Sequence, residues 1–85
     1  MKITIESTSK IVTLVVNGHD VPARVWQGET DTGIPVHCFI TRIAPEIPES
    51  DPRIGELTAQ FEAELTRTVK PRVDFGAIDL RYFID

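Results

Sequence analysis

Residues 17–43 constrain the fold more than any other part of the chain, because two β-prone runs flank a short polar centre. The centre, Asp31-Thr32-Gly33, has the residue types of a three-residue turn whose glycine adopts the left-handed region. Asn17-Gly18, which precedes the first run, is a strong turn signal because both residues tolerate positive φ. We therefore expect a long β-hairpin over residues 17–43.

Further strands are predicted from short runs of alternating or continuous apolar residues. The run at 3–6 alternates, the run at 11–16 is apolar on both faces, and Ser7-Thr8-Ser9 between them indicates a turn. Near the end of the chain, Ile78, Leu80 and Tyr82 alternate with polar residues and indicate a last strand. The predicted strands are 3–6, 11–16, 21–28, 34–43 and 74–84.

An amphipathic helix is predicted after a stiff, acidic connector. Residues 44–51 form the proline-rich connector, and Pro52 suits the first position of a helix. Apolar residues then recur at spacings of three and four over 52–69, and they are Ile54, Leu57, Phe61, Leu65 and Val69. The sequence thus predicts one α+β domain over residues 1–85 with the order β-β-β-β-α-β. Its mostly antiparallel sheet has about five strands, starting with a meander over 2–43, and one helix packs on one face.

Composition narrows the classes of function. The formal net charge of −4 opposes general attraction to phosphate, so nucleic-acid binding is not expected. No run reaches the ~20 apolar residues of a membrane-spanning helix. Cys38 is the single cysteine, which excludes an intrachain disulfide and suits a reducing cytoplasm.

Two groups of residues invite a catalytic or metal interpretation. Asp31-Thr32-Gly33 spells the aspartic-protease triplet, but polar residues precede it and a turn would choose the same residues. His37 and Cys38 are neighbours on a strand, so they point to opposite faces and cannot both bind one ion. No further ligand spacing completes a zinc site with His19. We therefore predict a non-enzymatic protein with no cofactor and no metal.

The residues with the strongest interaction chemistry lie in the predicted hairpin. In the expected register Trp26 lies on the side of Cys38, and Arg24 on the side of Ile40. Tryptophan and arginine are enriched at interface hot spots and at stacking sites. Either Trp26 belongs to the core beneath the helix, or it belongs to a surface that binds.

The candidate binding surface consists of Arg24, Trp26, His37 and Arg42. Since one helix covers only one face of a small sheet, the apolar second face of 11–16 also predicts a homodimer.

Several segments resemble a group of small proteins encoded by tailed bacteriophages and prophages of Gram-negative bacteria. The similar segments are residues 2–8, 17–18, 21–26, 28, 33–34, 39–43, 61–65 and 77–81. The resemblance covers most of the chain and implies a phage or prophage origin and the cytoplasm of an infected or lysogenic bacterium. It implies no activity, cofactor or site residue.

A small, acidic phage protein with few catalytic groups is expected to act by binding. The leading hypothesis is an accessory protein that binds a host protein and inhibits a host process or defence system. The alternative is an oligomeric sponge for small ligands such as nucleotide signals, held by Arg24 and Trp26. A third hypothesis is a structural or assembly component of the virion.

Overall fold

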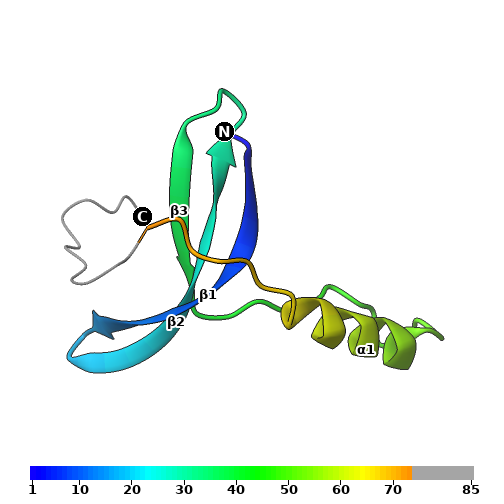
Figure 1. Ribbon diagram of the computed structural model, residues 1–85. Helices are drawn as coiled ribbons and strands as arrows, with labels where there is room; N and C mark the ends of the chain where they lie inside the picture. Colours follow the sequence, from blue (N-terminus) through cyan, green and yellow to red (C-terminus); the bar gives the residue numbers. More distant parts are fainter. Residues whose placement is uncertain (74–85) are drawn as a thin grey trace.

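A computed structural model describes residues 1–73 and shows a three-stranded antiparallel sheet with one helix. The strands are β1 (Ile3–Val16), β2 (His19–Thr30) and β3 (Pro35–Ile40), in the sheet order β1-β2-β3. The helix, α1, spans Ile54–Leu65. Figure 1 shows the sheet on one side and the helix projecting away from it. The predicted α+β class is confirmed.

The two turns of the meander form as their residues predict. Asn17 and Gly18, between β1 and β2, have positive φ angles of 50° and 76°. Gly33, in the loop between β2 and β3, has a φ of 90°, and its amide donates to the Thr30 carbonyl at 3.0 Å. The expected register also holds, because Trp26 pairs with Cys38 across β2 and β3.

Four of the five predicted strands fall within residues 1–73, where the structure has three. The predicted runs 3–6 and 11–16 belong to one 14-residue strand, β1, and the expected turn at 7–9 is a bulge within it. Ser7 pairs with Trp26 and Ile11 with Arg24, so three residues of β1 lie opposite Val25 alone. The predicted strand 74–84 lies outside the described residues.

Side chains and a later segment of the chain satisfy the backbone of this bulge. The Thr8 hydroxyl donates to the Val25 carbonyl at 2.7 Å and accepts from the Lys10 amide at 3.2 Å. The Arg24 guanidinium donates to the Thr8 carbonyl at 2.7 Å. Bulges bend the strand that carries them, and Figure 1 shows the β1–β2 ribbon turning sharply at this level.

Residues 67–72, here called the strap, cross from the end of α1 back over the sheet. Val69 forms an isolated parallel bridge with Thr8, donating to the Ser7 carbonyl at 2.9 Å and accepting from the Ser9 amide at 3.0 Å. Gln27, which is buried, accepts from the Arg72 amide at 2.8 Å. The strap therefore replaces ladder partners that the bulge takes away from β1.

The strap explains why the predicted helix 52–69 is too long. The helix ends at Leu65, and the Thr66 hydroxyl donates to the Ala63 carbonyl at 2.7 Å. Residues 66–69 include two threonines and a valine, which are β-branched and favour extended backbone. Val69 pairs with β1 and therefore does not continue the apolar stripe of the helix.

The expectation that the helix packs on one face of the sheet is also wrong. No residue of α1 is buried, and the helix with the connector 41–53 forms an arm that projects from the sheet (Figure 1). The Cα radius of gyration is 15.2 Å, whereas a compact domain of this length has about 12 Å. The described core is correspondingly small, with Val12, Ala23 and Val25 buried on one face of the sheet.

Candidate functional site

The two faces of the sheet differ in what covers them. The face of Val25 carries the core, to which Leu14 and Phe39 add partly buried side chains. The opposite face carries Arg24 and Trp26, because successive residues of β2 alternate between faces. The arm projects away from the sheet instead of lying across it (Figure 1).

A hollow of about 270 Å³ opens on this second face. Its floor and walls come from β1, β2, β3, the segment after β3 and the last residue of α1. The lining residues are Ile11, Pro22, Ala23, Arg24, Trp26, Ile40, Thr41, Arg42, Ile43 and Leu65. This set of residues is called the hollow below.

The apolar part of the hollow is exposed to solvent. The side chains of Ile11 and Ile43 have exposed fractions of 54% and 46%, and Trp26 and Ile40 are half-buried. Apolar surface that gathers in one concave place on a small protein is typical of an interaction site. Trp26 therefore lies at a surface and outside the core of residues 1–73.

Two arginines supply the charge of the hollow. The Arg24 guanidinium is fixed by its bond to the Thr8 carbonyl, and this bond uses one of its five N–H groups. Arg42 follows β3 and is exposed. Within residues 1–73, no carboxylate or histidine lines the hollow. A guanidinium keeps its proton in proteins, so these two side chains attract anions and cannot act as bases.

Three of the four predicted surface residues therefore meet in one place, and the fourth does not. Arg24, Trp26 and Arg42 line the hollow, whereas His37 pairs with Gln27 and lies on the opposite face. Burial, followed by the charge of Arg72, lowers the pKa of His37 below its ordinary value. The alternation of side chains along β3 was the signal that separates His37 from the other three.

The hollow also has contributors that the sequence did not indicate. Ile11 belongs to the run 11–16, but the bulge sets which of its residues lies beside Arg24. Leu65 is the last residue of α1, 25 residues after the end of β3, and only the path of the arm brings it to the hollow. Neither contribution follows from local spacing.

The other groups weighed for chemistry lie apart from the hollow. The Asp31-Thr32-Gly33 triplet forms the exposed β2–β3 loop, in which the Ile34 amide donates to the Thr30 hydroxyl at 3.1 Å. Among residues 1–73, no three His, Cys, Asp or Glu side chains gather closely enough to hold a metal ion. No helix in this part of the chain is both long and apolar enough to cross a membrane.

Compared with known proteins, the chain matches no family model, no curated protein and no solved structure. The geometry of the hollow is therefore the basis for the assignment that follows.

Proposed function

We propose that this protein acts by binding another protein through the hollow. The observation that carries the proposal is the meeting of Arg24, Trp26 and Arg42 over an exposed apolar floor that the helix leaves uncovered. Tryptophan and arginine dominate the energy of many protein interfaces, where a central aromatic anchor is surrounded by polar contacts. Two permanent positive charges beside apolar side chains favour a partner segment that is both acidic and apolar.

The setting proposed for this binding is a bacterium that carries the corresponding phage or prophage. The resemblance of the sequence to small phage proteins supports that setting, and it makes a host protein the proposed partner. A small accessory protein that occupies a surface of a host enzyme or defence protein inhibits it without any chemistry of its own.

The second candidate function is a sponge for a small anionic ligand. The adjacent Arg24 and Trp26 favour it, because a base could stack on the indole while the guanidinium holds a phosphate. The exposure of the hollow argues against it, since small-molecule sites bury most of the ligand, whereas Ile11 and Ile43 are 54% and 46% exposed. An open hollow of about 270 Å³ suits a protruding protein side chain better.

The test is capture of partners from a lysate of the infected host by the tagged protein. The informative variant combines Trp26→Ala with Arg42→Glu. Arg42 is preferred to Arg24 because Arg24 also holds the bulge of β1, so its loss would disturb the fold. The partner retained by the wild-type protein should be lost.

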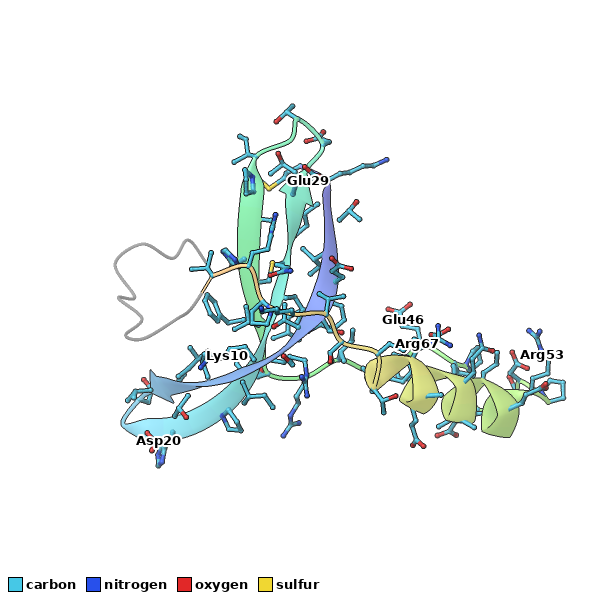
Figure 2. The ribbon with its side chains drawn as sticks, in the orientation of Figure 1. Lys10, Asp20, Glu29, Glu46, Arg53 and Arg67 are labelled. Carbon is cyan, nitrogen blue, oxygen red and sulfur yellow. The ribbon has the colours of Figure 1, made fainter. Side chains whose placement is uncertain are left out.

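The matched control combines Ile34→Ala with Arg53→Glu, which makes similar changes away from the hollow. Ile34 is 61% exposed in the β2–β3 loop, and Figure 2 shows Arg53 at the outer end of the arm. The control should retain the partner. A partner that stays bound to the Trp26/Arg42 variant would refute the assignment to the hollow. A stoichiometric small molecule in native mass spectra would favour the sponge.

A further inference from the structure

Among residues 1–73, helix α1 has an apolar stripe that no other element fully covers. Leu57, Phe61 and Leu65 are half-buried and Ile54 is exposed, although the connector runs beside the helix (Figure 1). An isolated helix of 12 residues is marginal in water and depends on packing of its apolar face. The stripe therefore needs a docking surface.

The charges of the helix and the hollow are complementary. Glu56, Glu62 and Glu64 are the charged residues of α1, which has no lysine, arginine or histidine. Of the described residues that line the hollow, two are arginines and none is an acid. Two helices packed stripe to stripe would bring Glu62 and Glu64 of both copies together, whereas a helix placed in the hollow meets opposite charge.

The helix cannot fill the hollow of its own chain in this arrangement. Leu65 already lines the hollow, and the helix extends outward from that point, so its earlier turns lie away from the sheet (Figure 1). The connector that leads out from β3 to the start of α1 contains Pro45, Pro48 and Pro52, which restrict its backbone. A helix from another molecule is free of this constraint.

We propose that two copies of this chain form a symmetric dimer in which α1 of each copy docks its stripe in the hollow of the other. Each copy carries both the stripe and the hollow, so a two-fold axis makes the same contact twice. The Leu57 and Phe61 side chains lie over the apolar floor of Ile11, Trp26 and Ile43 of the second copy. Glutamates beside the stripe face Arg24 and Arg42.

This inference rests on the proposed function in one respect, which is that the hollow is a docking surface. A host partner that binds there displaces the helix of the second copy. Partner binding therefore converts the dimer into a complex that contains a single copy of this chain.

The first measurement is the mass of the wild-type protein in solution by light scattering at micromolar concentration. The expected mass is twice the 9.5 kDa of the chain. Phe61→Glu in the helix and Ile43→Glu in the hollow should each give the monomer mass, while Ile34→Glu in the β2–β3 loop should leave the dimer intact. Since neither Phe61 nor Ile43 is buried, circular dichroism should show the fold retained in both monomeric variants. A wild-type protein with the monomer mass would overturn the proposal.

The second measurement identifies the contact by cross-linking two differently tagged copies, both carrying Cys38→Ser. One copy carries Phe61→Cys and the other Ile43→Cys, and a short bis-maleimide should join them. The pair Phe61→Cys with Ile34→Cys is the control and should stay unlinked. If the reagent joins two Phe61→Cys copies but does not join Phe61→Cys to Ile43→Cys, the proposed docking of each helix in the hollow of the other copy is wrong.

The two proposals fail in different ways. A monomeric protein that still captures a partner through Trp26 and Arg42 would refute the helix-in-hollow dimer but support the proposed function. A dimer that forms the helix–hollow cross-link but captures no partner would support the helix-in-hollow dimer and refute the proposed function.

Discussion

Replacing Gly28 by alanine tests a close backbone approach between β1 and β2. A Cβ atom built on Gly28 falls 2.7 Å from the Thr4 carbonyl carbon and 2.8 Å from the Ile5 Cα atom, and it overlaps the Thr4 carbonyl oxygen. All three atoms are backbone atoms of β1, so no side chain can rotate away. Gly28→Ala can be accommodated only if β1 moves away from β2.

The expected cost follows from that geometry. Overpacking against a rigid neighbour costs about 1–3 kcal/mol, and a clash with backbone belongs at the upper end. A chain of this length is stable by roughly 4–13 kcal/mol, and the small described core places this protein near the lower limit. A loss of about 3 kcal/mol lowers the melting temperature by about 12–24 °C in a domain of this size.

The assay is thermal and urea unfolding followed by circular dichroism, with Gly55→Ala as the matched control. Nothing lies within 4 Å of a Cβ at Gly55 in the helix, and alanine there should stabilise by up to ~1 kcal/mol. Glycine-to-alanine substitution should therefore lower the free energy of unfolding at position 28 and raise it at position 55. A Gly28→Ala protein within ~0.5 kcal/mol of the wild type would refute the close β1–β2 approach.

Two further predictions concern the strap and the opposite face of the sheet. Gln27→Ala removes the buried acceptor of the Arg72 amide and should lower the free energy of unfolding by about 1–3 kcal/mol in urea titrations. The control, Gln60→Ala at an exposed position, should stay within ~0.5 kcal/mol of the wild type. Equal effects of the two substitutions would show that Gln27 does not anchor the strap. Because the pKa of His37 is lowered in the native state, the unfolded chain binds its proton first as the pH falls. The free energy of unfolding should therefore decline below about pH 6.5, the ordinary histidine value, and level off at the native pKa. His37→Gln should remove this dependence and His19→Gln should not, and a decline that survives His37→Gln would contradict the burial of His37.

The sequence was sufficient where a local signal determines the structure. Asn17-Gly18 and Gly33 have the positive φ angles that their turns require, and these turns set the register of the hairpin. The position of Trp26 opposite Cys38 follows from that register and from strict alternation. These features depend on residues that are neighbours in the chain or across one turn.

The sequence was insufficient where a distant segment decides the outcome. The polar residues 7–9 have the composition of a turn, but Val69 supplies backbone partners that let β1 continue through a bulge. The same pairing ends α1 at Leu65, because Val69 is held in an extended segment. An apolar stripe predicts that a helix needs a docking surface, but it does not say which surface. In this chain the helix does not pack on its own sheet, and we propose that it docks in the hollow of a second copy.

Fluorescence of Trp26 is the most direct test that the hollow is the binding surface. It is the single tryptophan of the chain and lies half-buried in the hollow, so its emission reports on that site alone. A tryptophan-free segment of the captured partner is titrated into the monomeric Phe61→Glu variant, in which no helix of a second copy covers Trp26. Occupation of the hollow by apolar side chains should shift the emission to shorter wavelength and protect it from iodide quenching. Saturable binding that leaves both the emission and the quenching of Trp26 unchanged would contradict the central claim.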